Sequence, residues 1–280
     1  MKKFILLFLL LSFFGINAQP NCEAFKMRGE MLKYESCKKA METKGHYQFS
    51  KEYQVKLDEA IEIDPTYDYP YWAKSIAYLK SGDFITWKKL IDKAVKYNPE
   101  DRLGYRGWCR YQFFRDYKGA IEDIEELDRL VDYDIGQSQN GMYHLNIAKG
   151  LCYKAIGERD KAIDIIEKQI KLNEEEDFIG AYDYVHLGVL YLETGEIEKA
   201  IEVFEKQSGY NDLAENQYYL ALSQQKLGKT AESRISLENA RKLYLKGRKM
   251  FDPYNHPMDK IYLEDIDREI EQLTLRVDKN

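Results

Sequence analysis

The sequence predicts an all-α solenoid built of about six helical hairpins and closed by a C-terminal capping helix. Two observations predict this fold class. A spacing of small, aromatic and aliphatic residues recurs every 33 to 38 residues. Pro65 and Pro99, which are 34 residues apart, each follow a helical pattern that a proline would end. A hairpin of this size cannot bury its own apolar face, so we expect each hairpin to stack on its neighbours.

Residues 1–18 have the features of a secretory signal peptide. Lys2 and Lys3 precede an apolar run from Phe4 to Phe14, and Ala18 is a small residue at the expected cleavage position. The run is shorter than the roughly 20 residues that cross a bilayer, so an uncleaved anchor is the lesser alternative. The polar residues before Cys22 do not resemble the cleavage motif of a lipoprotein. We therefore expect an exported bacterial protein, periplasmic or secreted, with no integral membrane segment after cleavage.

The charge balance argues against nucleic acid and anionic membranes as partners. The chain has 42 basic and 48 acidic residues and a formal net charge of −6. Cleavage of the signal peptide would remove two of the lysines and no acidic residue. Phosphate-rich partners are bound by clustered Lys and Arg, and this sequence shows no such excess.

Turn residues divide a repeat domain, residues 19–247, into hairpins. We expect these at about 23–64, 68–100, 101–134, 143–176, 181–213 and 214–247. The first should open with one long helix, turn at Gly45 and His46, and end before Pro65. Residues 135–142 interrupt the period, and their polar, glycine-containing composition predicts an exposed loop.

Residues 248–280 follow the last hairpin. Two prolines, Pro253 and Pro257, interrupt the helical pattern. From Met258 to Leu275 apolar and charged residues then alternate with helical period. A one-sided helix at the end of a solenoid would cover the last exposed apolar face, so we expect a capping helix. A dimerising arm is the alternative.

The repeat resembles the tetratricopeptide repeat family. The residues that fit its pattern best are Tyr184, Leu187, Gly188, Tyr191, Gly195, Ala200 and Phe204. Related residues recur in phase in the neighbouring hairpins, and the resemblance covers residues 34–247. Trp87 and Trp108 depart from it, because they occupy positions that are usually small. The resemblance implies a right-handed superhelix, with small residues where the two helices of a hairpin cross closely.

The same resemblance implies a partner-binding groove along the concave side, lined by the first helix of each hairpin. Its positions are occupied here by Tyr69, Trp72, Ile76, Arg102, Tyr105, Arg106, Phe113, His144, Ile147, Tyr182, Val185, His186 and Tyr218. Family members that clamp a C-terminal carboxylate use Lys, Asn and Arg in such positions. The mostly aromatic and aliphatic set found here instead favours an extended or helical segment held by aromatic anchors.

Export would permit disulfide bonds between the four cysteines. Cys109 and Cys152 fall at similar places in adjacent repeats and form the more favoured candidate pair. On one continuous helix Cys22 and Cys37 would be about 22 Å apart, so they could pair only if the start of that helix is unwound. Buried free thiols are the alternative for all four.

Catalytic signals are weak. Residues 223–230 nearly match a phosphate-binding loop, but Ser223 replaces the required first glycine and the segment follows a helix. The histidines show no metal-ligand spacing, and no nucleophile motif is present. We therefore predict a protein that is not an enzyme and that uses no cofactor and no metal.

The expected function is non-catalytic binding of a peptide or protein segment in the groove, as an adaptor or assembly factor of the cell envelope. One alternative is a helical-solenoid enzyme or a polysaccharide-handling factor, which a cleft with converging buried carboxylates would favour. Another is a structural oligomer formed through the terminal helix, for which weak self-association would be the sign.

Overall fold

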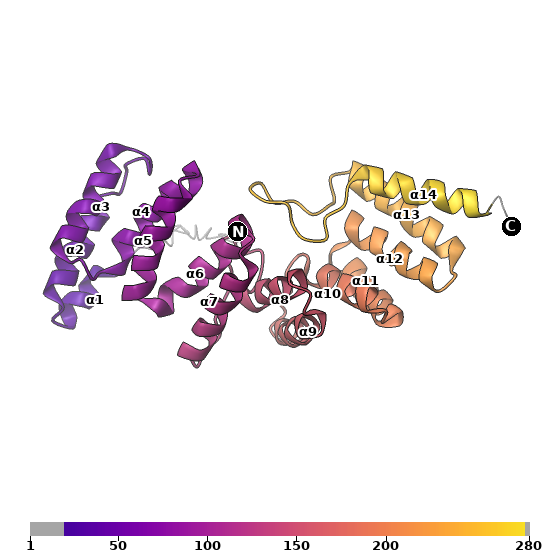
Figure 1. The fold of residues 1–280 in the computed structure, drawn as a ribbon, viewed down its shortest axis with the longest axis horizontal. Helices are drawn as coiled ribbons and strands as arrows, with labels where there is room; N and C mark the ends of the chain where they lie inside the picture. Colours follow the sequence, from indigo (N-terminus) through magenta and orange to yellow (C-terminus); the bar gives the residue numbers. More distant parts are fainter. Residues whose placement is uncertain (1–19, 278–280) are drawn as a thin grey trace, which may run out of the picture. The chain divides into compact units, whose positions relative to one another are not determined.

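The computed structural model describes residues 20–277, and the predicted signal peptide lies outside these residues. The described chain folds into fourteen α-helices and one π-helical turn, with no strand beyond an isolated bridge between Gln137 and His144. The helices form paired antiparallel hairpins, which confirms the all-α, hairpin-built fold class (Figure 1). No helix between residues 20 and 277 is long and apolar enough to cross a membrane.

The described helices fall into two compact units, residues 20–97 and residues 98–277, where the sequence predicts a single repeat domain. The first unit holds α1 (Cys22–Met27), α2 (Met31–Met41), α3 (Lys51–Ile63), α4 (Asp68–Ser81) and α5 (Phe84–Tyr97). The second unit begins with α6 (Pro99–Cys109), η1 (Arg110–Phe114), α7 (Tyr117–Leu130), α8 (Leu145–Ala155) and α9 (Arg159–Glu175). It continues with α10 (Asp183–Thr194), α11 (Ile197–Asn211), α12 (Ala214–Lys226), α13 (Thr230–Leu245) and α14 (Leu263–Val277).

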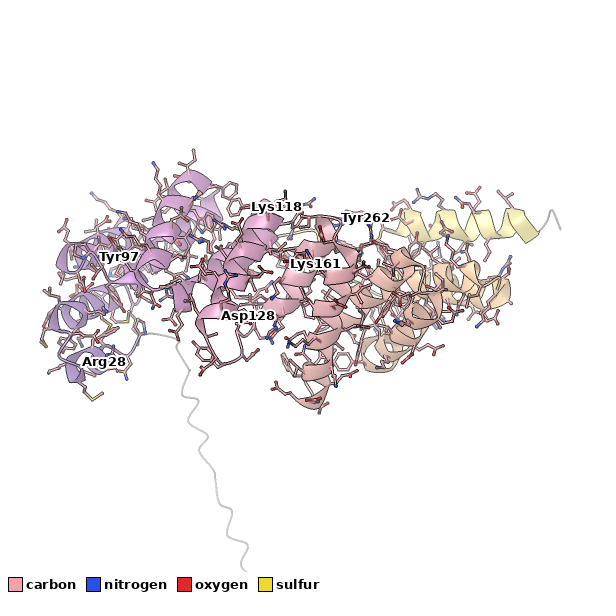
Figure 2. All side chains as sticks on the ribbon, turned by 60° about the horizontal axis from the view of Figure 1, so that its bottom comes forward. Arg28, Tyr97, Lys118, Asp128, Lys161 and Tyr262 are labelled. Atoms are coloured by element: carbon pink, nitrogen blue, oxygen red, sulfur yellow. A yellow bond between two sulfur atoms is a disulfide. The ribbon has the colours of Figure 1, made fainter. Side chains whose placement is uncertain are left out.

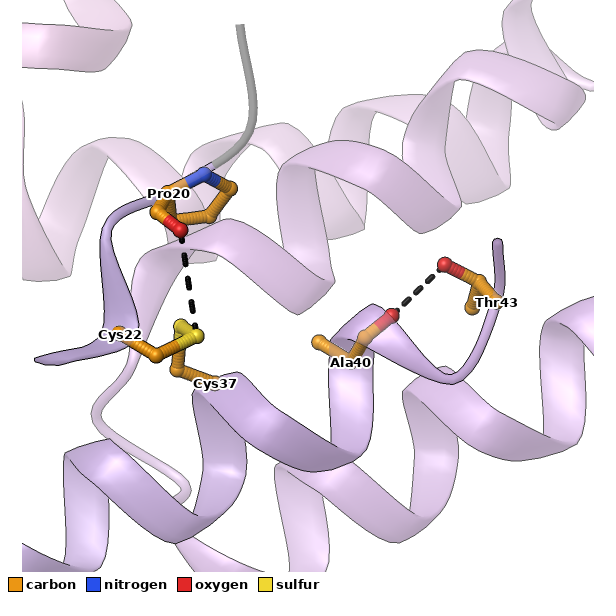
Figure 3. The surroundings of a disulfide bond; sticks show 5 residues. All are labelled: Pro20, Cys22, Cys37, Ala40 and Thr43. Atoms are coloured by element: carbon orange, nitrogen blue, oxygen red, sulfur yellow. Dashed lines mark hydrogen bonds between the residues drawn. A yellow bond between two sulfur atoms is a disulfide. The ribbon is translucent and has the colours of Figure 1, made fainter. Parts of the chain in front are cut away.

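The expected long first helix is broken into α1 and α2. Gly29 lies between them with φ 77°, a left-handed conformation that glycine adopts without steric cost and that ends a helix. The chain reverses there, and Cys22 on α1 meets Cys37 on α2 with their Cα atoms 5.5 Å apart (Figure 3). The two cysteines form a disulfide bond that closes the N-terminal turn of the first unit.

The candidate disulfide between Cys109 and Cys152 is wrong, and buried free thiols, the other interpretation of these cysteines, are what the structure has. Both are free and fully buried, Cys109 at the end of α6 and Cys152 within α8. Burial raises the pKa of each thiol, which keeps the thiols protonated and unreactive. The choice between the two pairs depended on whether the first helix was continuous, and its break at Gly29 reverses that choice.

Small residues set the close crossing of helices within hairpins. A β-carbon on Gly188 of α10 would lie 2.4 Å from Cε1 of Phe204 on α11, so the ring occupies the space that a side chain at position 188 would need. Phe204 is fully buried. In the preceding hairpin a β-carbon on Gly150 would come equally close to Ile166. The glycine of the repeat is therefore a packing requirement, in agreement with the role that the resemblance implies.

Local signals fix the helix ends. Ser50 and Asp116 precede α3 and α7, and their side chains accept hydrogen bonds from the main-chain N–H groups of Tyr53 and Gly119. Gly195 ends α10 with φ 86°, as the turn glycine of the repeat should. These caps explain why the hairpin turns fall where the pattern predicts them.

The C-terminal helix covers α13, as a cap would. Ile266 and Leu273 of α14 are buried in one apolar cluster with Leu237 and Ala240 of α13. The helix starts at Leu263 rather than near Met258, because residues 258–262 are not helical.

The insertion at 135–142 is a largely exposed loop, as its composition predicts, but part of it is buried. Ile135 and Ser138 are buried, and the N–H of Ser138 donates to the carbonyl oxygen of Tyr143 at 2.7 Å. The composition indicated a turn, but it could not indicate that the turn folds back on the start of α8.

Candidate functional site

Residues 248–262, here called the return segment, connect α13 to α14 without any helix. Instead of turning directly, this segment runs back across the repeats and contacts η1, α8, α10 and α12 (Figure 1). It ends at Tyr262, immediately before α14 (Figure 2). The surface formed by η1, α8, α10 and α12 is here called the first-helix face. The helices α8, α10 and α12 are the first helices of the last three hairpins, and η1 continues α6, the first helix of the hairpin before them.

The start of the return segment is held through its main chain. The carbonyl oxygen of Arg248 accepts a hydrogen bond from the N–H of Ala214, at 2.9 Å. The N–H of Met250 donates to the carboxylate of Glu215 at 2.9 Å. The hydroxyl of Tyr182 accepts from the N–H of Phe251 at 3.0 Å and lies 3.3 Å from the carbonyl oxygen of the same residue. These contacts hold main-chain atoms of residues 248–251, and the side chain of Met250 is itself fully buried.

Two aspartates fix the rest of the segment through their side chains. Nε2 of Gln112 donates to Asp252 at 2.7 Å. The carboxylate of Asp259 lies 2.6 Å from Nζ of Lys154 and 2.7 Å from Nδ1 of His186. The side chains of Asp259 and Lys154 are each 7% exposed, and that of His186 is not exposed. The return segment therefore places a carboxylate in a buried, positively charged position on the first-helix face.

The electrostatics of this position favour an ionised carboxylate. Burial acts to raise the pKa of Asp259, but the hydrogen bond from His186 and the charge of Lys154 outweigh it, and the net result is a lowered pKa. Lys154 also contacts Glu193 at 3.3 Å. A buried ammonium group is costly unless a carboxylate pairs with it, so Asp259 compensates a charge that the face already carries.

A chain of hydrogen bonds runs from Asp259 through His186 to Tyr143, whose hydroxyl lies 3.3 Å from Nε2 of the histidine. The order resembles an acid–base relay, but Tyr143 is buried and its pKa is raised well above the ordinary value, first by burial. A phenol in that state is no nucleophile. Among the described residues no group of three or more His, Cys, Asp or Glu side chains is arranged to hold a metal ion.

In the first unit the predicted groove residues lie on α4. Tyr69, Trp72 and Ile76 follow one side of this helix and are half-buried. The rings of Tyr69 and Trp72 are 5.5 Å apart, and Tyr67 stacks on Tyr69 at 6.1 Å. These three positions form a partly exposed aromatic and aliphatic row.

The predicted groove residues of the third hairpin are divided between surface and core. Arg102 and Phe113 are half-buried, and Tyr105 is buried. Arg106 is turned toward its own hairpin, where its guanidinium makes two hydrogen bonds to Asp123, at 3.0 and 2.6 Å. Arg106 therefore joins α6 to α7.

The remaining groove positions do not form the open wall that the sequence predicts. His144 precedes α8 and accepts a hydrogen bond from the N–H of Asn146, so it acts as a helix cap. Ile147 and Val185 are fully buried in the core of the second unit. Tyr182 and His186 lie beneath the return segment, as their contacts to Phe251 and Asp259 show.

Tyr218 is also buried, in the apolar cluster that includes α14. The helical period predicts which side of a helix a residue lies on. It cannot predict that a later segment will cover that side.

Tyr182 and His186, which hold the return segment, were among the predicted site residues, but the other side chains in these contacts were not. They are Gln112, Lys154, Glu215, Asp252 and Asp259. The sequence pattern predicts a break in the helix at residues 252–257, and the structure has this break. The pattern does not predict which helices the segment then contacts. The burial of Lys154 would indicate that a carboxylate must pair with it, but burial cannot be read from the sequence.

Asp183, at the start of α10, provides a test of the electrostatics of this face. It is fully buried, and burial raises its pKa to about 6, above the ordinary value near 3.9. The folded state therefore holds this proton more tightly than the unfolded state, and wild type loses stability as pH rises from 4 to 6. Asp183→Asn keeps an oxygen for the N–H of Gly180 but does not titrate. We expect the variant to gain roughly 2 kcal/mol relative to wild type across that interval.

The measurement is urea unfolding of wild type and Asp183→Asn at several pH values between 4 and 7.5. The stability difference should change most between pH 4 and 6 and become constant about one pH unit above the raised pKa. A difference that is independent of pH would show that Asp183 has an ordinary pKa in the folded protein.

Stacked hairpins with a non-helical segment laid across their first helices define a helical-repeat protein. Residues 143–176 and 184–212 match a family model described as tetratricopeptide repeat, and residues 215–244 match a second model with the same description. Over these three ranges the chain is similar to tetratricopeptide repeats. No curated protein matches the sequence.

Solved structures of other proteins have a similar fold over two thirds or more of the chain. PilW, a type IV pilus biogenesis factor, matches with a TM-score of 0.55 at 11% identity, covering 80% of this chain and 90% of that one. PilF of Pseudomonas aeruginosa matches with a TM-score of 0.54 at 13% identity, covering 89% and 94%. YrrB, described as having an unusual peptide-binding site, matches with a TM-score of 0.53 at 15% identity, covering 67% and 91%. At these identities the likeness shows the fold alone.

Proposed function

We propose that this protein is a non-catalytic scaffold that binds an extended segment of another protein along the first helices of its repeats. Tetratricopeptide repeats support a role in protein–protein interaction, and three of the repeats match that family. The proposal places the protein in the cell envelope, where it would act as an adaptor or an assembly factor.

One observation supports this function most directly: the first-helix face already holds a non-helical polypeptide segment. The return segment is bound through main-chain hydrogen bonds to Tyr182 and Glu215 and through a buried ion pair at Asp259. Main-chain recognition combined with a few buried side chains is how folded domains commonly bind peptides. A surface with these properties suits a segment from a partner as well as one from its own chain.

Two observations support the envelope. The N-terminal sequence has the pattern of a signal peptide. The Cys22–Cys37 disulfide is of a kind that persists in oxidising compartments and is rare in the cytosol. PilW, whose fold is similar, is a type IV pilus biogenesis factor, which agrees with an assembly role.

The alternatives receive less support. Buried carboxylates do converge on the first-helix face, which is the feature that would favour an enzyme. Asp252 and Asp259, however, are engaged by Gln112, Lys154 and His186, so they anchor a polypeptide and do not line an open cleft. The apolar side of α14 packs on α13 of the same chain, which favours a cap over an oligomerising arm.

The test is site-specific photo-crosslinking in cells of the source bacterium. A photoreactive amino acid replaces Ile76, which lies half-buried on the predicted binding side of α4. The matched control places it at Ile85 of the same unit, which is 73% exposed at the start of α5. We expect a discrete crosslinked protein at position 76, with at least about tenfold lower yield at position 85, because specific partners occupy one face.

Equal yields at the two positions, or no crosslinked protein at either, would contradict the proposed function. Circular dichroism of both purified variants must first match that of wild type, so that a negative result cannot come from unfolding.

A further inference from the structure

The return segment and the first-helix face together describe the partner. We propose that residues 248–262 are a displaceable internal occupant of the partner site, and that the partner is a non-helical polypeptide that bends as this segment does, with an apolar residue followed by carboxylates two and nine positions later. This inference rests on the proposed function, because it takes the first-helix face as the binding surface. It adds both the chemistry of the ligand and a means of regulation.

The spacing follows from the three points at which side chains of the segment enter the face. Met250 is fully buried in the core cluster of the second unit. Asp252, two residues on, accepts from Gln112, and Asp259, nine residues on, lies between Lys154 and His186. An occupant that matches these points would give Gln112, Lys154 and His186 the same carboxylate partners that the return segment gives them.

The carboxylate at the Asp259 position is the most selective requirement. The Lys154 side chain is 7% exposed, and its other carboxylate neighbour, Glu193, is farther away, at 3.3 Å compared with 2.6 Å for Asp259. A neutral occupant would leave this ammonium group undercompensated in a buried position. The face should therefore reject an amide at that position.

The middle of the return segment is suited to exchange. Phe251 and Tyr254 are 65% and 79% exposed, so their rings do not add to the packing on the face. Between Met250 and Asp259 the polar contacts of the segment could be made equally well by a competing chain, and hydrogen bonds exchanged for equivalent ones change the free energy little. Gly247, with φ 77°, provides a turn at which the segment can separate from α13.

The segment is covalently joined to the protein that it binds, and this sets the affinity that a partner needs in order to displace it. A segment joined to its own site acts at an effective concentration in the millimolar range, so weak binders cannot replace it. Weakening the segment at Asp259 should open the site to a free peptide of the same sequence.

The experiment uses a fluorescent synthetic peptide with the sequence of residues 248–262 and a control peptide in which Asp259 is replaced by asparagine. Both are titrated by anisotropy into the full-length protein, as wild type and as Asp259→Asn. We expect the variant to bind the native peptide at least tenfold more tightly than wild type does. We also expect it to bind the native peptide at least tenfold more tightly than the control peptide.

Equal, weak binding in all four combinations would overturn the inference and identify the return segment as a permanent part of the fold. Hydrogen exchange on wild type is the second measurement, which needs no variant. The amides of Met250 and Phe251 should exchange at least tenfold faster than the core amides of α10, through local opening. Exchange of these amides only through global unfolding would also overturn the inference.

The two proposals fail separately. If the peptide is not exchanged but a partner crosslinks at position 76, the scaffold function stands and the displacement model is wrong. If the peptide is exchanged but no partner crosslinks, the face can bind polypeptide and the proposed scaffold function fails.

Discussion

Gly188→Ala is expected to lower the free energy of unfolding by about 3 kcal/mol, a large effect for one methyl group. The added β-carbon would lie 2.4 Å from the ring of Phe204, well inside contact distance. The ring is fully buried between α10 and α11, so it cannot move aside without disturbing the hairpin. Urea unfolding followed by circular dichroism measures the loss.

Gly209→Ala is the matched control on the partner helix. Nothing lies within 4 Å of its added β-carbon, and alanine is the better helix former. We expect a gain of about 0.5 kcal/mol. A loss below about 1 kcal/mol for Gly188→Ala would mean that the hairpin adjusts its crossing, contrary to the packing described here.

Removing the disulfide is expected to cost a similar amount, about 3 kcal/mol, in the first unit. The bond joins residues 15 apart in sequence and holds α1 against α2, so without it the unfolded chain gains freedom that the bond denies it. The change is Cys22→Ala with Cys37→Ala, and the measurement is thermal unfolding with hydrogen exchange to separate the two units.

A reducing agent supplies the control. It should destabilise wild type and leave the double variant unchanged, because Cys109 and Cys152 are already free thiols. The exchange rates of α10 amides should not respond. If reduction has no effect on wild type, then the bond does not stabilise the first unit.

The hairpin fold could be predicted because its signals are local and repeated. Gly188, Gly195 and Ala200 each have a role that depends on the hairpin in which they occur, and the pattern recurs in phase along the chain. The break at Gly29 was also present as a local signal, a glycine inside an expected helix. The helical pattern on both sides of Gly29 nevertheless favours one continuous helix, and a continuous helix would keep Cys22 and Cys37 apart. The structure joins these two cysteines because the helix is broken.

The candidate site could be predicted only in part, because it depends on contacts between residues far apart in sequence. Tyr182 and His186 do lie on the side that the period predicts. What covers them is Phe251 and Asp259, some 70 residues later, in a segment that looks like an ordinary helix break. Neither periodicity nor composition contains that pairing, and Lys154 becomes meaningful only once its carboxylate partner is known.

The return segment also changes how the second unit should fold. In most repeat arrays each repeat contacts only its neighbours, so the ends fray and stability is nearly additive along the chain. Here Gln112 and Asp252 are joined across 140 residues, and Lys154 and Asp259 across 105. Residues 98–277 should therefore melt as one cooperative block. Its long-range contacts also form slowly, since they must wait for the last-synthesised part of the chain.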